Sequence, residues 1–143
     1  MERQPLPQTL ITASGIRTEP SLYRRLGGYD TIAAIIDSVL ERLGSDTRFA
    51  RFNGGRGEDS RRSGRQLLVD QLCELSGGPC IFLGRDMRTS HARLGITKGD
   101  WKATMRHMAR TLRELRVARK ESDEVIALWT CYKGEIVALP GVR

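Results

Sequence analysis

Apolar residues recur through the middle of the chain with the spacing of amphipathic helices. Between residues 30 and 43 they fall at i, i+3, i+4, i+7, i+8 and i+11, which places them on one helix face: Ile32, Ile35, Ile36, Val39, Leu40 and Leu43. Leu68, Leu72 and Leu75 form a second stripe, on a helix expected to begin near Asp59 or Ser60. Both helices should face a common core.

Capping residues and glycines delimit the predicted helices. Each start carries a polar side chain able to accept hydrogen bonds from free backbone N–H groups: Ser21, Asp30, Asp46, Thr97 with Asp100 as a capping box, and Ser122. Gly27-Gly28 and Gly77-Gly78-Pro79 end two helices, and Pro140 closes the last one. Cys80 to Leu83 is apolar but has no alternating partner, so it is expected to be an extended connector. These patterns predict an all-α domain of five or six helices without a strand pair.

A short segment between Gly84 and Thr97 carries the candidate chemistry. On a helix of two or three turns, Met87, His91 and Leu94 share one face, which is apolar except for the imidazole. A neutral imidazole nitrogen is a good metal ligand, and haem iron in globins is held by one such histidine. An ordinary helix histidine is the simpler interpretation of this segment alone. A helix this short is marginal in isolation, however, and a metal–ligand bond would stabilise it.

Composition narrows the class of protein. The 143 residues suit one domain, and no apolar run is long enough to span a membrane. Residues 1–20 are polar and resemble no signal peptide, so a flexible N-terminal extension and a cytoplasmic location are expected. The net charge of +7 comes from scattered basic residues with few aromatics among them. This pattern favours a solvated basic surface over a nucleic-acid groove.

The three cysteines are Cys73, Cys80 and Cys131. Their number is odd and they form no Cys-x-x-Cys pair, so they are expected to be reduced and mostly buried thiols. No Cys-x-x-Cys-His motif is present, so covalent c-type haem attachment is not indicated.

Taken in order, three segments of the chain resemble the truncated haemoglobins, and most closely the first group of that family. They are Ser21-Leu22-Tyr23 with Leu26-Gly27-Gly28, then Leu75-Ser76-Gly77-Gly78-Pro79, then Gly84-Arg85-Asp86-Met87 with His91-Ala92-Arg93-Leu94-Gly95-Ile96-Thr97. Each glycine pair alone is weak, but both pairs together with the histidine segment are specific. The resemblance covers roughly Ser21 to Val137.

The resemblance implies a truncated globin domain over residues 21–143, folded as a two-over-two helical sandwich around haem b. His91 occupies the position of the iron ligand. The expected cofactor-binding residues are Leu40, Phe52, Leu68, Leu72, Phe82, Met87, Arg88, Leu94, Ile96, Trp101 and Trp129. For Trp101 and Trp129, plain core packing is an equal alternative. Arg65, Arg88 and Arg93 are candidate partners of the haem propionates, with surface solvation as the alternative.

The side of the pocket opposite His91 departs from the family pattern. Oxygen-binding members of the group commonly carry a tyrosine where this chain has Leu40 and a glutamine where it has Leu68. Gly64 stands at the usual ligand gate, and Asn53 replaces a usual haem-packing phenylalanine. Gln71 is the nearest polar candidate for this side, although solvent exposure is the simpler expectation for it.

Leu40 and Leu68 cannot donate a hydrogen bond to a bound gas, as a tyrosine and a glutamine at these positions would, and this changes the expected gas affinity. A donor beside bound dioxygen contributes roughly 1–3 kcal/mol, so its loss lowers oxygen affinity on the order of tenfold or more. CO and NO binding depends less on such a donor.

The expected function is therefore reversible binding of a diatomic gas (O2, NO or CO) in an apolar pocket, as in oxygen transport. A haem enzyme, either a nitric oxide dioxygenase or a peroxidase-like catalyst, is the alternative, and a haem-free basic interaction module is a third. Whether the protein is an enzyme is left open. A reductase is a conceivable partner, no nucleic-acid or membrane partner is expected, and the chain is predicted to be a monomer or weak homodimer. His107 is expected to be a helix residue near the surface.

Overall fold

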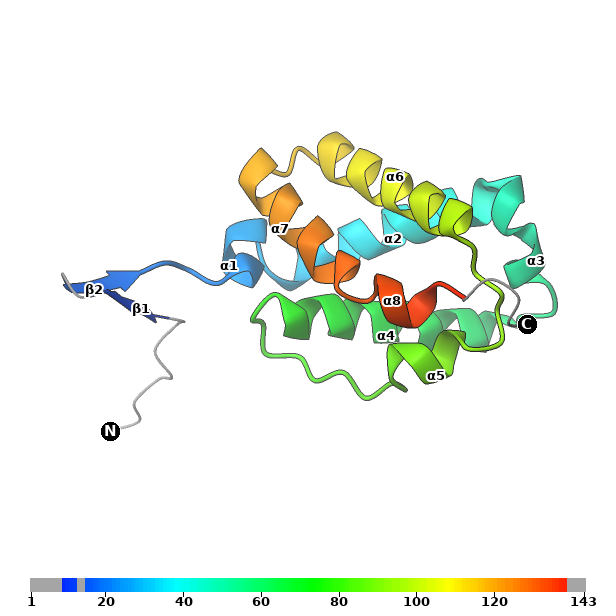
Figure 1. Ribbon diagram of the computed structural model, residues 1–143. Helices are drawn as coiled ribbons and strands as arrows, with labels where there is room; N and C mark the ends of the chain where they lie inside the picture. Colours follow the sequence, from blue (N-terminus) through cyan, green and yellow to red (C-terminus); the bar gives the residue numbers. More distant parts are fainter. Residues whose placement is uncertain (1–8, 13–14, 139–143) are drawn as a thin grey trace.

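The computed structural model describes residues 9–12 and 15–138. The helices are α1 (Leu22–Leu26), α2 (Tyr29–Ser45), the 3-10 turn η1 (Thr47–Phe49), α3 (Ala50–Asn53), α4 (Glu58–Leu75), α5 (Met87–His91), α6 (Lys98–Glu114), α7 (Arg119–Thr130) and α8 (Lys133–Ile136). A hairpin of β1 (Thr9–Thr12) and β2 (Gly15–Thr18) precedes them. Figure 1 shows the helices gathered in one body, with the hairpin projecting from the α1 end.

Helix α2 lies at the centre of the helical body. It packs against α4 on one side and against α6 on the other, and α6 packs in turn on α7 (Figure 1). The apolar face predicted for residues 30–43 supplies four of the buried core side chains: Ile32, Ile35, Ile36 and Val39. Val69 and Leu72 from α4 and Met108 and Leu112 from α6 complete its surroundings. The predicted all-α fold is thus confirmed.

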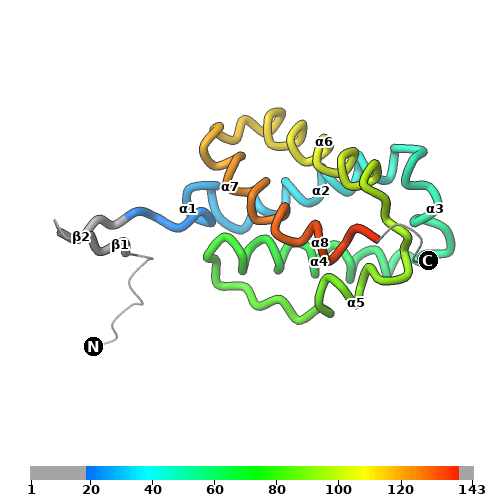
Figure 2. The backbone as a smooth tube through the Cα atoms, viewed as in Figure 1, coloured from blue at the N-terminus to red at the C-terminus, as the bar shows by residue number. Residues whose placement is uncertain are grey.

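Helix α5 is attached differently from the long helices. It has five residues and packs chiefly against α8 near the C-terminal end of the chain. Figure 2 shows the chain leaving α4, running back as an extended connector through residues 76–86 and then entering α5 below α4. As predicted, residues 80–83 form neither helix nor strand. The backbone N–H of Ala138 donates to the carbonyl of Ile96, at 2.8 Å, which joins the segment after α8 to the segment after α5.

Three of the predicted caps are present in the structure. The side chains of Ser21 and Asp46 accept hydrogen bonds from backbone N–H groups three and two residues on, those of Arg24 and Arg48. Thr97 and Asp100 form the reciprocal capping box of α6. Gly27 ends α1 in the left-handed conformation, with φ of 110°, as a glycine there was expected to do.

Two predicted caps were wrong. Helix α2 begins one residue before Asp30, with Gly28 as its N-cap, so Asp30 lies in the first turn, where its charge favours the helix dipole. Helix α7 begins at Arg119 because Ala118 already has the extended conformation of an N-cap. Ser122 lies inside this helix, and its hydroxyl donates to the carbonyl of Val117 at 3.3 Å.

The structure has more helices than the five or six predicted. Among the described residues there are eight α-helices, because α3 and α8 are four-residue helices too short to show a periodic pattern. A turn at Cys131 and Tyr132 also divides the predicted last helix into α7 and α8. Pro140, the predicted end of that helix, lies outside the described residues.

The hairpin before α1 was not anticipated. Its strands pair antiparallel, with Thr9 opposite Thr18 and Thr12 opposite Gly15. Threonine and isoleucine, which favour strands, are frequent in both of them. The predicted flexibility of the extension over residues 1–20 stays a prediction, and residues 1–8 lie outside the described part.

The expectation of three reduced thiols was wrong. Cys73 and Cys80 form a disulfide, with their Cα atoms 5.6 Å apart. The reversal of the chain after α4 brings the two residues together although seven positions separate them, and spacing alone gives no sign of that reversal. Cys73 is fully buried, whereas the remaining free cysteine, Cys131, is exposed and not buried as expected.

No helix in the described part of the chain has the length and apolar character needed to cross a membrane.

Candidate cofactor cavity

A cavity of about 480 Å³ lies among α2, α4, α5, α6 and the α7–α8 region. Its volume falls within the roughly 300–1,000 Å³ typical of cofactor and ligand sites. The walls are predominantly apolar. Helix α2 contributes Ile36, Val39, Leu40 and Leu43, helix α4 contributes Leu67 and Leu68, and the opposite side includes Met87, Leu94 and Ile96.

His91 lies on the wall of this cavity, at the end of α5. Its ring atom Nδ1 is 2.9 Å from the carbonyl oxygen of Met87 and 2.8 Å from the Ser90 hydroxyl. Because a carbonyl can only accept, the contact with Met87 assigns the proton to Nδ1, and in this tautomer of the neutral ring Nε2 keeps a free lone pair. Histidines that bind metals typically donate their other N–H to such a carbonyl, which fixes the tautomer and the ring orientation.

Most of the predicted cofactor-binding residues come together in the cavity wall. Those lining it are Leu40, Phe52, Leu68, Phe82, Met87, Leu94, Ile96, Trp101 and Trp129, together with His91. Leu72 and Arg88 do not line it. Leu72 is fully buried in the core that α4 shares with α2, and Arg88 is exposed on α5, three positions before His91. Gly64 and Asn53, noted above as departures from the family, also line the cavity.

The cations at the cavity are not the ones the sequence indicated. Arg65 donates to the carboxylate of Asp37, with 2.6 Å between Nε and Oδ1, and this hydrogen bond raises the pKa of Arg65 and lowers that of Asp37. Arg88 and Arg93 are exposed and lie outside the lining. Arg56 and Arg85 line the cavity instead. Both lie in loops, where helical periodicity gives no signal for the direction of a side chain.

Gln71 is the polar exception on the α4 side of the cavity. It is only 7% exposed and lines the cavity, so the expectation that it faces solvent was wrong. Its amide donates to the sulfur of Met87 at 3.3 Å, a weak acceptor. The rest of this wall, formed by α2 and α4, is built from aliphatic side chains with Gly44 and Gly64.

His107 lies outside the cavity lining. Its Nε2 is 2.8 Å from a carboxylate oxygen of Asp46, and its ring packs edge-on against Phe49 with centroids 6.2 Å apart. The hydrogen bond from His107 lowers the pKa of Asp46. The second histidine therefore anchors α6 to the turn after α2, in agreement with its expected place near the surface.

A buried carboxylate, that of Asp100, fixes the start of α6 next to the cavity. Asp100, 3% exposed, accepts the Thr97 N–H of the capping box, binds Arg48 at 3.0 Å and also forms an ion pair with Arg51. Burial alone would raise the pKa of Asp100, but these hydrogen bonds outweigh it and lower the pKa to about 2. This cluster fixes the start of α6, which carries Trp101, against the segment that carries Phe49 and Phe52.

The residues present fit a haem. Among the described residues no group of three or more histidine, cysteine or acidic side chains could hold a bare metal ion. A single imidazole would be sufficient to hold iron whose other protein-independent ligands are the four nitrogens of a porphyrin. The apolar walls suit the porphyrin faces, and Arg56 and Arg85 offer cationic donors for its carboxylates.

Comparisons with known proteins agree with this geometry. A profile of the bacterial-like globin family matches residues 21–137. The chain is 27% identical to the group 1 truncated hemoglobin LI410 of Chlamydomonas moewusii, over 97% of this chain and 85% of that protein. It is 24% identical to the group 1 truncated hemoglobin GlbN of a Nostoc species, over 82% of this chain and 97% of that protein.

Solved structures give the same result for the fold. The crystal structure of truncated hemoglobin from Tetrahymena pyriformis superposes with a TM-score of 0.74 at 22% identity, covering 83% of this chain and 99% of that one. The 2/2 hemoglobin of Synechococcus sp. PCC 7002, described with a covalently attached heme, gives a TM-score of 0.74 at 25% identity, covering 82% and 98% of the two chains. The match of the family profile to most of the chain shows that this protein belongs to the bacterial-like globin family, as a truncated haemoglobin.

Proposed function

We propose that this truncated globin holds haem b through His91 and reversibly binds a diatomic gas on the side of the cavity formed by α2 and α4. When bound, the haem supplies an iron centre with one coordination position open to a gas. The chain's own contribution is to bind and orient the cofactor, to exclude water, and to set the polarity around the gas.

The observation that carries the proposal is the position of the His91 ring on the cavity wall and its contact with the Met87 carbonyl. The Met87 carbonyl accepts the Nδ1 proton, which leaves Nε2 as the free electron-pair donor of a ring on the cavity wall. Because the carbonyl belongs to the same helical turn, the ring orientation is fixed before any cofactor enters. Arg56 and Arg85 would hold the propionates.

The side of the cavity formed by α2 and α4, called the gas side below, is apolar, and this supports binding of a gas without its strong chemical activation. Leu40 and Leu68 line the cavity where relatives of the group commonly carry a tyrosine and a glutamine. Aliphatic side chains exclude water but offer no proton, so a bound gas with partial negative charge gains no hydrogen bond from them. Gln71 is the polar side chain on this wall, and the Met87 sulfur takes its amide hydrogen bond.

Reconstitution with haem tests the assignment of the ligand. The purified protein is titrated with haemin, reduced and exposed to CO, and its visible spectrum is compared with those of His91→Ala and His107→Ala. We expect His91→Ala to lose the normal Soret band and to retain haem poorly, with imidazole in solution restoring the spectrum in part. His107→Ala is the matched control, since His107 lies outside the cavity, and its spectrum should equal that of the unchanged protein. The opposite result would refute the assignment of His91.

A second experiment separates gas binding from enzymatic turnover. The reduced, oxygen-loaded protein is mixed rapidly with NO, and nitrate is measured. Fast stoichiometric nitrate formation sustained by a reductant would support a nitric oxide dioxygenase and contradict the binding proposal. Rapid release of the gas or autoxidation without turnover is the expected outcome.

A further inference from the structure

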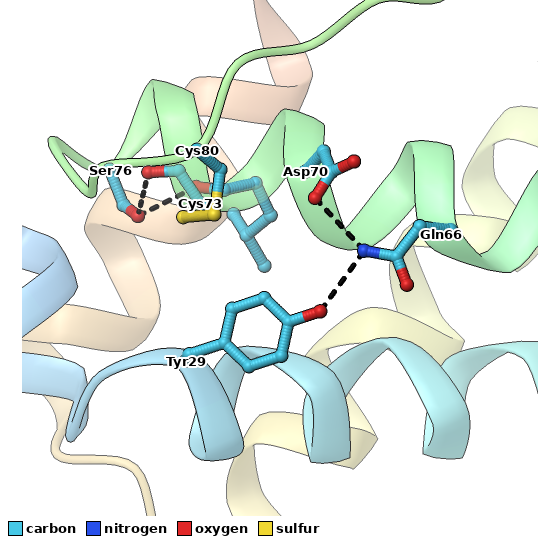
Figure 3. The surroundings of a disulfide bond; sticks show 7 residues. Tyr29, Gln66, Asp70, Cys73, Ser76 and Cys80 are labelled. Carbon is cyan, nitrogen blue, oxygen red and sulfur yellow. Dashed lines mark hydrogen bonds between the residues drawn. A yellow bond between two sulfur atoms is a disulfide. The ribbon is translucent and has the colours of Figure 1, made fainter.

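The disulfide of Cys73 and Cys80 joins the last turn of α4 to the connector that leads to α5. Figure 3 shows the two cysteines beside Ser76, whose hydroxyl donates to backbone carbonyls at the end of α4, at 2.6 Å for Leu72 and 3.1 Å for Cys73. The backbone N–H of Gly78 also donates to the Cys73 carbonyl, at 2.7 Å. The start of the connector is therefore fixed by these hydrogen bonds and by one covalent bond.

Beyond Cys80 the connector has few constraints. Residues 81–86 form neither helix nor strand, and Ile81 and Leu83 are 67% and 85% exposed. Phe82 turns inward, where it lines the cavity together with Gly84 and Arg85. Helix α5 follows at once, and with five residues it depends on this connector and on α8 for its position. A change at Cys80 thus acts directly on the segment that carries Phe82 and, through α5, His91.

The two cysteines differ in accessibility. Cys73 has no exposed surface, whereas Cys80 is partly exposed at the edge of the core. A thiolate from solution can therefore approach the disulfide only from the Cys80 side. Attack at the Cys80 sulfur releases the Cys73 sulfur into an apolar environment, which favours its protonated form.

We propose that Cys73–Cys80 is a thiol–disulfide exchange site whose substrates are dithiol or monothiol reductants, and that its oxidation state sets how firmly α5 holds the cofactor. In the exchange, a thiolate attacks the Cys80 sulfur and the Cys73 sulfur leaves with a proton. A second external thiol then attacks the sulfur of the first and displaces the Cys80 sulfur, which takes up a proton, so two external thiols become one disulfide while the protein gains two thiols. Reduction frees residues 79–86 from α4, and α5 then keeps α8 as its main support. The consequence for haem rests on the function proposed above.

The test uses the full chain with Cys131→Ser, so that Cys73 and Cys80 are its only thiols. The protein is equilibrated in glutathione buffers of graded ratio, its free thiols are counted after alkylation, and trypsin cleavage at the exposed Arg85 is followed. The same samples are loaded with haem, and the rate of haem transfer to an excess of an apoglobin is measured. We expect reduction to accelerate both cleavage and haem transfer several-fold, while far-ultraviolet circular dichroism stays unchanged.

The variant that also carries Cys73→Ser and Cys80→Ser serves as the matched control, because it should behave like the reduced protein in every buffer. If this variant fails to fold, the reduced Cys131→Ser protein alone provides the comparison. Equal cleavage and haem-transfer rates in the two oxidation states would overturn the proposal, as would two free thiols under all conditions. If neither state binds haem, the proposed function fails, whereas thiol counting and cleavage still decide whether the exchange site exists.

Discussion

Replacing Asp100 by asparagine is the perturbation for which the structure gives the clearest magnitude. The carboxylate is almost fully buried, and it binds Arg48, Arg51 and the Thr97 N–H at the start of α6. Asparagine keeps the shape and one acceptor oxygen but removes the charge that both guanidinium groups face. The variant should therefore loosen the junction between α6 and the η1–α3 segment.

The size of the effect follows from the pKa of Asp100, which lies at about 2 in the folded protein against an ordinary value of 3.8. At 1.36 kcal/mol per pH unit, this interval corresponds to about 2.5 kcal/mol of stability carried by the ionised group. A lowered pKa means that the unfolded chain takes up the proton first as the pH falls. The contribution is accordingly complete above about pH 5, declines below 3.8 and is lost near pH 2.

Urea unfolding of the two proteins at a series of pH values between 7 and 2 measures this contribution. At pH 7 we expect Asp100→Asn to lower the free energy of unfolding by about 2 kcal/mol, and the difference from the unchanged protein should shrink as the pH approaches 2. Asp123→Asn is the control, since Asp123 forms an exposed i,i+4 pair with Arg119, at 3.8 Å, that contributes little. A difference that stays constant over the whole pH range would show that lost packing, and not the charge, causes the destabilisation.

Two further substitutions test other parts of the structure. Leu68→Gln places a hydrogen-bond donor on the gas side of the cavity and should slow oxygen dissociation on the order of tenfold, as measured by stopped-flow replacement with CO. The control Leu115→Gln, at an exposed position after α6, should leave the dissociation rate unchanged. Gly78→Ala would place a Cβ 2.5 Å from the Tyr23 ring and 2.7 Å from the Cys73 sulfur, so it should cost about 1–3 kcal/mol in thermal or urea unfolding. Gly134→Ala meets nothing within 4 Å and should be neutral or slightly stabilising, and equal effects of the two alanines would contradict the packing argument.

The sequence predicts the parts of this fold that depend on periodic patterns. The apolar residues of α2 recur often enough to identify both the helix and its buried face, and the Thr97–Asp100 capping box identifies the start of α6. The short segment alone favours an ordinary helix histidine, and His91 is proposed as a ligand because the segment and the two glycine pairs together resemble the truncated haemoglobins. Its hydrogen bond to Met87, which supports that role, needs only the i,i+4 geometry of a helix.

Several of the errors concern side chains whose position depends on the path of a loop. Arg56 and Arg85 reach the cavity from loops, whereas Arg65, on the regular helix α4, turns to Asp37 on α2. The Cys73–Cys80 pair depends on the reversal of the chain at Gly77 and Gly78, which no spacing rule describes. Leu72 belongs to the same stripe as Leu68 but lies one turn further along α4, deep in the core and past the end of the cavity wall.

The support that α8 gives to α5 bears on how the protein should be handled at its C-terminus. Ala138 is hydrogen-bonded to Ile96, so the final residues of the fold lie next to the segment that presents the imidazole. An affinity tag or a shortened terminus at this end would disturb His91, the proposed iron ligand, although it is more than forty residues away in sequence. Tags and fluorescent fusions therefore belong at the other terminus, because Figure 1 shows the hairpin of β1 and β2 projecting away from the helices.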